Sequence, residues 1–277
     1  MITLTNLHFS YGKKPLFTDL QLNVPAGNIY GLLGMNGAGK TTLLKIIAGQ
    51  LFRKSGEAEV LGFDPVKRHP DMLADIFYLP EEFYLPNMSI ATYLKLNVPF
   101  YPKFDSHAFD SYISDFVLDT SQKISDYSYG QKKKFLLSFG LASNTSLLIL
   151  DEPTNGLDIP SKTQFRRTVA SALTEERTFI ISTHQVRDME NLIDPIIILH
   201  DGEIIFNSSL EDVSEKIATT LELDEPQGAD VIYSEKVPGG YSVVRKDSHG
   251  SFTSGVDLET LFNAVVSSPK SFKGGVK

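Results

Sequence analysis

The sequence predicts an α/β fold with a mainly parallel core sheet, an N-terminal antiparallel β subdomain, an inserted helical subdomain and a small C-terminal appendage. Short, continuous apolar runs recur along the chain with helical stretches between them, which is typical of parallel strands covered on both faces. The run at 29–33 leads directly into the glycine-rich stretch GMNGAGK and then into a segment with helical spacing. Strand, loop and helix therefore follow one another at the start of the predicted core.

Before that run, apolar residues alternate with polar ones, for example at Leu20, Leu22 and Val24, in the pattern of a half-buried strand. We therefore expect the segment before the glycine-rich stretch to be mostly sheet. TTLLKIIAG is expected to form a helix that ends at Gly49. Further on, SIATYLKL, HAFDSYISDFVL and QKKKFLLSFGLAS have helical spacing with proline- and aspartate-rich breaks, and they predict the inserted helical subdomain at about 86–143.

Three further apolar runs predict strands of the same parallel sheet, at 147–150, 178–182 and 196–199. After Gly202 the pattern weakens, and we expect a helix near 210–218, a turn at 238–240 and a helix near 258–266.

The chain is expected to divide into one domain of residues 1–215 and a C-terminal appendage of residues 216–277, whose role the sequence does not indicate. The final SSPKSFKGGVK has the composition of a loose tail.

The composition excludes several classes of function. The formal net charge of −8 over 277 residues argues against binding to duplex nucleic acid, and we interpret Lys132-Lys133-Lys134 as solvated lysines at the start of a helix. No apolar run reaches the roughly 20 residues that span a bilayer, and the start MITLTNLHFSYG lacks the layout of a secretion signal, so we expect a cytoplasmic protein. The absence of cysteine excludes disulfides, thiolate zinc sites and thiol nucleophiles.

GMNGAGK and the threonine after it match the G-x-x-x-x-G-K-[ST] spacing of a P-loop, between a predicted strand and a predicted helix. Glycines let backbone amides curve around phosphates, and the start of a helix favours negative charge. The Lys40 ammonium can reach the outer phosphates, and the Thr41 hydroxyl can bind Mg²⁺. The sequence therefore predicts a P-loop NTPase. The residues expected to bind the nucleotide in this segment are Gly34, Asn36, Gly37, Gly39, Lys40, Thr41 and Thr42.

The strand at 147–150 ends in Asp151-Glu152, which places two carboxylates at the carboxyl edge of the parallel sheet, where open α/β folds bind ligands. Asp151 suits a magnesium ligand, and Glu152 can polarise a water near the γ-phosphate as a general base. The alternative is an acidic surface pair that caps the following turn. An idle charge directly after four apolar residues is the less favoured interpretation.

Over about residues 1–215 the chain resembles the nucleotide-binding subunit of ATP-binding cassette (ABC) transporters. Ser128-Tyr129-Gly130-Gln131 is similar to the LSGGQ signature of that family and precedes Asp151 by about 20 residues, as in the family. Taken alone, this segment is equally compatible with a turn and helix cap. The resemblance implies that Ser128, Gly130 and Gln131 bind the ATP of the opposite subunit in a head-to-tail dimer.

The resemblance extends to other positions. Tyr11, in FSYG, is similar to the aromatic residue that stacks on adenine, and Asn155-Gly156-Leu157-Asp158 is similar to the loop that crosses the dimer seam, with Asp158 as a further nucleotide contact. His184 follows the run TFIIS and a threonine, and resembles the switch histidine that contacts the γ-phosphate. Glu152 and His184 are therefore the expected catalytic residues.

The chain departs from the family pattern at two places. Tyr127 and Tyr129 replace the leucine and the first glycine of the signature, which puts the closeness of the partner subunit in doubt. In Tyr78-Leu79-Pro80-Glu81 the family commonly has glutamine where this chain has Glu81. A carboxylate can still bind magnesium, so Glu81 is included with Thr41 and Asp151 as an expected metal ligand.

The resemblance implies a magnesium-dependent ATPase that dimerises, with a second copy of the chain as the expected partner. It would drive a separate membrane-spanning subunit, in the direction of export, from the inner face of the cell membrane. A soluble cassette ATPase in translation or chromosome maintenance is the main alternative, although those relatives carry two cassettes or a long coiled coil. A cassette that binds ATP without hydrolysis, and a P-loop kinase or GTPase, are further alternatives. They are disfavoured by Glu152 with His184 and by the SYGQ segment, respectively.

Overall fold

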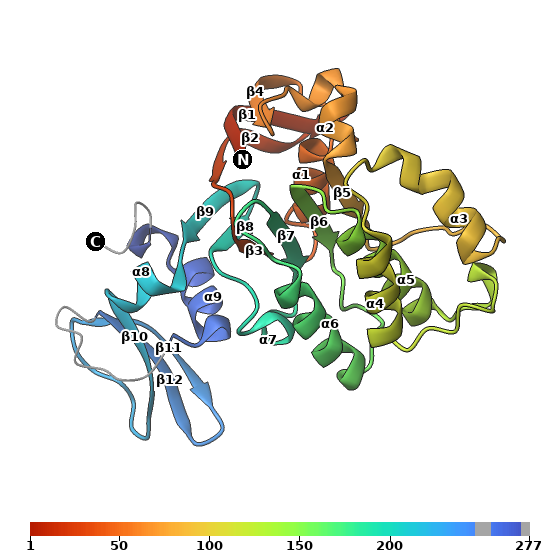
Figure 1. Ribbon diagram of the computed structural model, residues 1–277. Coiled ribbons are helices and arrows are strands. Elements are labelled where there is room, and N and C mark those ends of the chain that lie inside the picture. Colours follow the sequence, from red (N-terminus) through yellow and green to blue (C-terminus); the bar gives the residue numbers. More distant parts are fainter. Residues whose placement is uncertain (247–255, 273–277) are drawn as a thin grey trace.

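The computed structural model describes residues 1–246 and 256–272, and a mixed sheet forms its centre (Figure 1). The strands of this sheet follow the order β5-β6-β7-β3-β8-β9. In that order they are β5 (Ile76–Leu79), β6 (Leu147–Asp151), β7 (Thr178–Thr183), β3 (Ile29–Leu33), β8 (Ile196–His200) and β9 (Glu203–Ser208). Strands β5 to β8 are mutually parallel, and β9 runs antiparallel to β8. The predicted, mainly parallel core sheet is confirmed.

Both faces of this sheet are buried. Successive residues of each strand point to opposite sides, and each side contacts its own hydrophobic cluster. Leu148 and Leu150 of β6 belong to one hydrophobic cluster, and Leu147 and Ile149 belong to the other. The second cluster includes the apolar face of helix α1 (Lys40–Ile47), which follows β3. Burial on two sides explains why these strands form unbroken apolar runs in the sequence.

A second, antiparallel sheet closes the cluster that contains α1, and its order is β2-β1-β4. Its strands are β1 (Ile2–Tyr11), β2 (Lys14–Val24) and β4 (Ser55–Val60). Leu20, Leu22 and Val24 are buried as their alternation predicted. The turn η1 (Pro65–Lys67) and the short helix α2 (Pro70–Ala74) then lead to β5.

The expected helical subdomain forms a lobe at one side of the core sheet (Figure 1). Its elements are α3 (Ile90–Asn97), η2 (Val98–Phe100), α4 (Ser106–Asp115), η3 (Ile124–Asp126) and α5 (Tyr129–Ala142). Aromatic contacts join its helices. Phe135 and Phe139 of α5 meet Tyr93 of α3 at ring-centroid distances of 5.0 and 5.4 Å, and Phe109 of α4 lies 6.2 Å from Phe135. Helices α6 (Ile159–Ser171) and α7 (Val186–Met189) follow β6 and β7.

The C-terminal part contains a third sheet that the sequence analysis did not predict, with the order β10-β12-β11. Its elements, with the helices beside them, are α8 (Leu210–Ser214), β10 (Ile217–Glu222), β11 (Val231–Val237), β12 (Gly240–Lys246), α9 (Leu258–Ser267) and η4 (Pro269–Ser271). The turn expected at 238–240 joins β11 to β12. The helix expected near 210–218 is shorter than predicted, because the chain leaves the helix after Ser214 and Ile217 enters the core from a strand.

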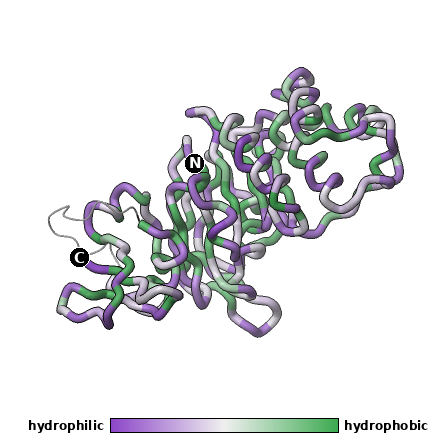
Figure 2. Tube along the Cα trace, turned by 90° about the horizontal axis from the view of Figure 1, so that it is seen from below, coloured by the Kyte–Doolittle hydropathy of each residue, from purple (hydrophilic) through white to green (hydrophobic). Residues whose placement is uncertain are grey.

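The C-terminal part shares its hydrophobic core with the rest of the molecule. Val244 of β12 and Leu261 of α9 are fully buried and belong to the same cluster as Leu150 of β6. Helix α9 also packs against α7, where Arg187 pairs with Glu259. Figure 2 shows hydrophobic positions running from the central sheet into this part of the chain.

The predicted loose tail is partly packed. Phe272 is 2% exposed, and its ring centroid lies 6.4 Å from that of Phe206 in β9. The rest of the predicted tail, residues 273–277, lies outside the described residues. Among the helices that the structure describes, none combines the length and the apolar character required to cross a membrane.

Candidate functional site

Three neighbouring strands bring the predicted site residues to one edge of the core sheet. Strands β6, β7 and β3 are adjacent and parallel, so their carboxyl ends meet there. Asp151 ends β6, Gly34 follows β3 and His184 follows β7. Residues that are far apart in the sequence therefore surround one site.

The P-loop needs its glycines for reasons visible in the backbone. Gly37 and Gly39 have φ angles of 82° and 107°, which favour glycine, and a Cβ on Gly34 would lie 2.5 Å from the carbonyl oxygen of Leu199. Gly39 is also the N-cap of α1, and no side chain caps that helix. The first amides of α1 are therefore available to an anion.

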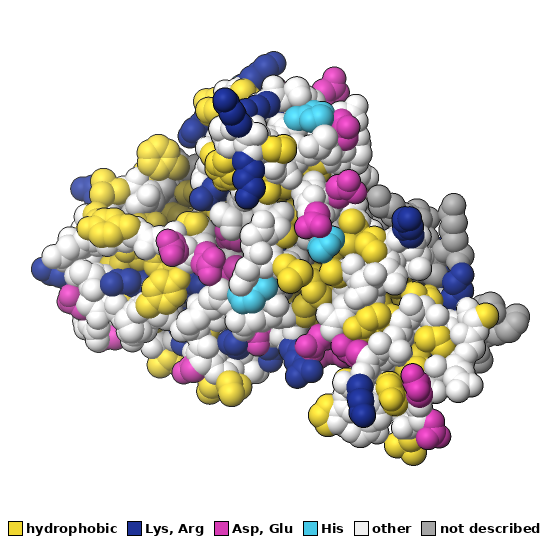
Figure 3. Space-filling model, turned by 180° about the vertical axis from the view of Figure 1, so that it is seen from behind, with side chains coloured by type: hydrophobic (Ala, Val, Ile, Leu, Met, Phe, Trp, Pro, Cys, Tyr) yellow, Lys and Arg dark blue, Asp and Glu magenta, His cyan; other side chains and the backbone are white. Residues whose placement is uncertain are grey.

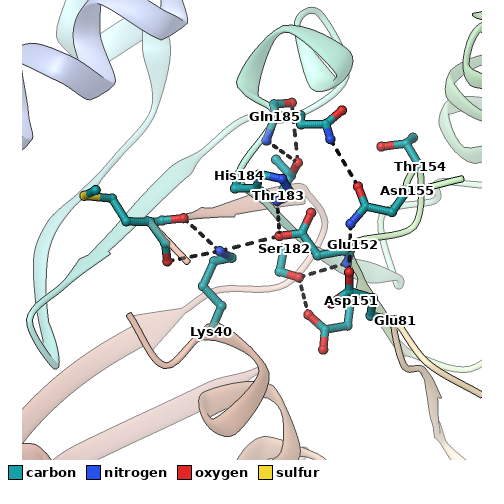
Figure 4. A network of polar contacts seen from close by, with 12 residues as sticks. Lys40, Glu81, Asp151, Glu152, Thr154, Asn155, Ser182, Thr183, His184 and Gln185 are labelled. Carbon is teal, nitrogen blue, oxygen red and sulfur yellow. Dashed lines mark hydrogen bonds and ion pairs between the residues drawn. The ribbon is translucent and has the colours of Figure 1, made fainter. Parts of the chain in front are cut away.

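The Lys40 side chain is buried between the P-loop and β6 (Figure 4). Its amine donates to the carbonyl oxygens of Gly34 at 2.7 Å and Met35 at 3.5 Å. The same nitrogen lies 3.5 Å from Glu152 Oε1. A single ammonium thus faces both the phosphate-binding loop and the predicted base.

Glu152 is held in an unusual backbone conformation directly after β6. Its φ angle is 46°, in the left-handed region, and its N–H donates to the carbonyl and the hydroxyl oxygen of Ser182. Its carboxylate is buried, and Oε1 lies 2.9 Å from His184 Nδ1. Within the described residues, Oε2 has no hydrogen-bond partner. A buried carboxylate oxygen without a partner is typical of a functional group.

Asp151 lies beneath this carboxylate and is fully buried. Ser182 donates a hydrogen bond to its Oδ1 at 2.5 Å, and the Tyr78 hydroxyl donates to its Oδ2 at 3.2 Å. Burial and then the Asp151 charge raise the pKa of Tyr78 above its ordinary value, which keeps this hydroxyl a donor. Glu81 lies at the same edge, where its Oε1 accepts from Asn155 Nδ2 at 2.8 Å.

The predicted metal ligands have the chemistry that Mg²⁺ requires. Thr41 and Glu81 line the cavity described below, whereas Asp151, next to Glu152 in the chain, is not among its lining residues. All three offer hard oxygen ligands. The described residues contain no cluster of three or more acidic, histidine or cysteine side chains that could hold a metal alone. Mg²⁺ is commonly bound by one or two carboxylates together with substrate phosphates and water.

A cavity of about 400 Å³ lies in front of these groups. Its lining includes the expected residues Tyr11, Asn36, Gly37, Gly39, Lys40, Thr41, Thr42, Glu81 and Glu152. Tyr11 is more than half exposed at the rim, where its hydroxyl lies 3.0 Å from Thr42 Oγ1. The chain therefore assembles a phosphate cradle, a candidate base and an exposed aromatic ring around one cavity.

The remaining predicted residues lie elsewhere. Ser128 is the N-cap of α5 and forms a reciprocal capping box with Gln131, and Gly130 is next to the loop that contains Gly156. Asp158 is the N-cap of α6, and its side chain accepts a hydrogen bond from the Ser161 N–H. Hydrogen bonds from Ser161 hold the pKa of Asp158 below its usual range. None of these residues lines the cavity beside Lys40. The structure thus separates the predicted site residues into two groups.

Comparison with known proteins supports the resemblance seen in the sequence. The family model described as "ABC transporter" matches residues 17–155, which is half of the chain. The chain belongs to the ABC transporter family. The P-loop, Asp151 and Glu152 all lie within the matched residues.

Relatives of this ABC chain include proteins with assigned roles. It is 33% identical to the bacitracin transport ATP-binding protein BcrA of Bacillus licheniformis, over 74% of this chain and 68% of that protein. It is 30% identical to the lantibiotic transport ATP-binding protein SrtF of Streptococcus pyogenes, over 76% of this chain and 92% of that protein. Among solved structures, a dimeric ATP-binding cassette in a post-hydrolysis state with ADP and Pi has a similar fold, with a TM-score of 0.66. It is 21% identical to this chain, and the match covers 76% of this chain and 99% of that chain.

Tyr129, one of the departures of this ABC chain from the family signature, is tied to the segment that contains Glu81. The Tyr129 hydroxyl donates to the carbonyl oxygen of Glu81 at 2.6 Å, and its ring stacks on Phe83 at a centroid distance of 5.2 Å. The Lys133 ammonium lies 5.3 Å from the centroid of the same ring. A glycine at position 129 would make none of these side-chain contacts.

Lys133 was misinterpreted from the sequence. We expected a solvated lysine, but its side chain is 2% exposed and donates to the carbonyl oxygens of Glu152 and Asn155. A lysine run at the start of a helix is normally solvated, which explains the error. Helical spacing gave no signal either, because Tyr129, four residues earlier on the same side of α5, is itself exposed.

Proposed function

We propose that this chain binds ATP with Mg²⁺ and hydrolyses it as the nucleotide-binding subunit of a transporter. The observation that carries the proposal is the buried Glu152 carboxylate, which lies beside Lys40 and His184 and has one oxygen without a partner among the described residues. In a P-loop protein, a carboxylate at this position can orient and polarise a water for attack on the γ-phosphate.

The residues on the cavity have distinct roles in this proposal. The amides of the P-loop and the Lys40 ammonium hold the phosphates and stabilise the charge that develops on the transferring group. Glu152 accepts the proton of the attacking water, and His184, within hydrogen-bond reach of Glu152, contacts the γ-phosphate. Mg²⁺ bound by Thr41, Asp151 and Glu81 would neutralise charge on the phosphate oxygens.

The separation of the two groups of site residues supports a head-to-tail dimer. The cavity beside Lys40 lacks Ser128, Gly130, Gln131 and Asp158. If two chains pair so that the Ser128 region of one faces the cavity of the other, both groups surround each nucleotide. The dimeric cassette found among solved structures supports this arrangement. Two copies of this chain are the proposed dimer.

A separate membrane-spanning subunit is the proposed partner, with export as the proposed direction. The relatives named for bacitracin and lantibiotic transport support this assignment. Exposed hydrophobic side chains lie on the helical lobe, at the left of Figure 3, and offer a docking surface; they include Tyr84, Leu96 and Phe100. The chain would then work at the inner face of the cell membrane. Residues 1–215 would form the cassette, and 216–277 an appendage whose role we do not assign.

The test compares the wild type with Glu152→Gln, which keeps the shape of the side chain but removes its basicity. Wild type should release phosphate from ATP in the presence of Mg²⁺. Glu152→Gln should lose at least about 100-fold in kcat, since general base catalysis contributes about 10²–10⁴-fold, and should still bind ATP. A variant with wild-type turnover would show that Glu152 is not the base.

A further inference from the structure

Lys133 is a buried charge that the proposed mechanism does not use. Its side chain extends from α5 to the end of β6, where the ammonium donates to Glu152 O at 2.9 Å and to Asn155 O at 3.0 Å. It also lies over the Tyr129 ring, as a cation–π pair. A buried ammonium persists only where such partners replace water. The contacts therefore define where the backbone of the Glu152–Asn155 turn must lie.

That turn holds the strained part of the site. Glu152 has a positive φ angle, an unfavourable conformation for a residue with a side chain, which persists only where the surroundings enforce it. The Glu152 carbonyl accepts from the Asn155 N–H at 3.3 Å as well as from Lys133. Lys133 thus fixes both ends of the turn, and the direction of the Glu152 side chain depends on this backbone.

We propose that Lys133 is a positioning residue that holds the Glu152–Asn155 turn from α5 and so aims the Glu152 carboxylate at the cavity. Helix α5 begins at Ser128, which the proposed dimer places at the nucleotide of the partner. Lys133 therefore also links the start of α5 to the base of its own chain. This inference rests on the proposed ATPase function.

The decisive variant is Lys133→Met, which keeps the length and the apolar stem but removes the donors. We expect kcat for ATP hydrolysis to decrease about 10- to 100-fold, because small displacements of a reacting group have effects of that size. Affinity for ATP should change less than about twofold, since Lys40 and the P-loop are not touched. Lys132→Met is the matched control. Within the described residues the Lys132 side chain has no hydrogen bond or ion pair, so the kcat of Lys132→Met should stay within about twofold of wild type.

Two further variants separate positioning from simple packing. Lys133→Gln reaches one carbonyl at most, because its amide is one bond shorter, and should retain between about a tenth and a half of the wild-type kcat with unchanged ATP affinity. If Lys133→Met does not fold, Lys133→Gln carries the test, and a wild-type kcat for it would overturn the inference. Lys133→Met combined with Glu152→Gln should be no slower than Glu152→Gln alone, since Lys133 acts through Glu152.

The outcomes also separate this inference from the proposed function. If the wild type does not hydrolyse ATP, or Glu152→Gln is fully active, the proposed function is wrong. If Glu152→Gln is inactive while Lys133→Met and Lys133→Gln keep wild-type kcat, only the positioning role is wrong. A loss of ATP affinity equal to the loss of kcat/KM in Lys133→Met would mean that Lys133 supports binding instead.

Discussion

Glu152 combines three features that are individually unfavourable: a left-handed backbone angle, a buried carboxylate and an oxygen that finds no partner in the described part of the chain. Folding alone gives no reason to keep such a residue, because a buried unpaired acceptor costs about 1–3 kcal/mol. Residues with this combination occur where function requires them. At the residue scale, the unfavourable energetics of Glu152 therefore point to a functional role as clearly as its position after β6 does.

Replacing Lys40 with alanine should weaken ATP binding at least tenfold, because the main counter-charge of the phosphates is lost from the P-loop. Titration with a fluorescent ATP analogue measures this. Lys45→Ala, in the last turn of the same helix, is the control and should bind normally. Unchanged affinity in Lys40→Ala would mean that GMNGAGK is only a structural turn.

Lys133 should also make stability depend on pH. Burial lowers the pKa of Lys133 from 10.5 to about 8, although the charges of Glu81, Glu152 and Asp151 oppose this shift. Between these two values the unfolded chain keeps a proton that the folded chain has lost, so the Lys133 contribution to stability increases as pH rises through about 8. The free energy of unfolding of wild type, relative to Lys133→Met, should therefore increase between pH ~7 and pH ~9.5. Urea unfolding at both pH values measures it, and a difference independent of pH would contradict this account.

Spacing in the sequence was sufficient to predict that Lys40, Asp151 and Glu152 lie together at one edge of the core sheet, because a strand end and a glycine loop fix where such side chains lie. It was not sufficient for Lys133. Whether a lysine on a helix is solvated depends on which face packs against the sheet, and that is decided by contacts with residues far away in the chain. Ser182 and Tyr78, which orient Asp151, were missed for the same reason.

At the scale of secondary-structure elements, Arg177 ties three segments together. Its guanidinium donates to the carbonyl oxygens of Leu141, Ala172 and Thr145, at the ends of α5 and α6 and before β6, and the side chain is buried. Arg177→Met removes the donor from the buried carbonyl oxygens of Ala172 and Thr145, while Leu141 O still accepts from the Asn144 N–H at 3.4 Å, so we expect a loss of about 3 kcal/mol in the free energy of unfolding. Urea denaturation measures the loss. Arg167→Met, at an exposed arginine of α6, should change stability by less than about 0.5 kcal/mol.

The elements of the C-terminal sheet could not be predicted from periodicity. Leu210, Val213 and Ile217 have helical spacing, yet the chain becomes a strand at Ile217, and both arrangements place these residues toward the same core. Strand β11 is only partly buried on either face, so apolar and polar residues do not alternate clearly along it, and the pattern that would predict a strand is missing. The order of strands in the core sheet could not be predicted from the sequence either, because strands that are neighbours in the sheet are often far apart along the chain, as β7 and β3 are.

At the scale of the whole molecule, the separation of the two groups of site residues predicts complementation between inactive chains. Ser128→Arg and Lys40→Ala should each be inactive alone. In a mixed dimer one site carries both defects and the other carries neither, so the mixture should regain up to about a quarter of wild-type activity, from random pairing of equal amounts and one intact site per mixed dimer. Phosphate release by the mixture measures this. An inactive mixture, with wild-type activity independent of protein concentration, would favour a monomeric enzyme.

The packing of α9 against α7 also matters while the chain is being made. The ribosome releases α7 long before α9, and during this interval Val186 and Met189, which are buried in the finished molecule, lack part of their cover. A nascent chain that ends before Leu258 already contains the P-loop, Glu152 and His184, but the helix directly after His184 is not yet supported. Val186 and Met189 therefore gain their full cover only when α9 emerges, and this part of the nascent chain is exposed to chaperones and proteases until then.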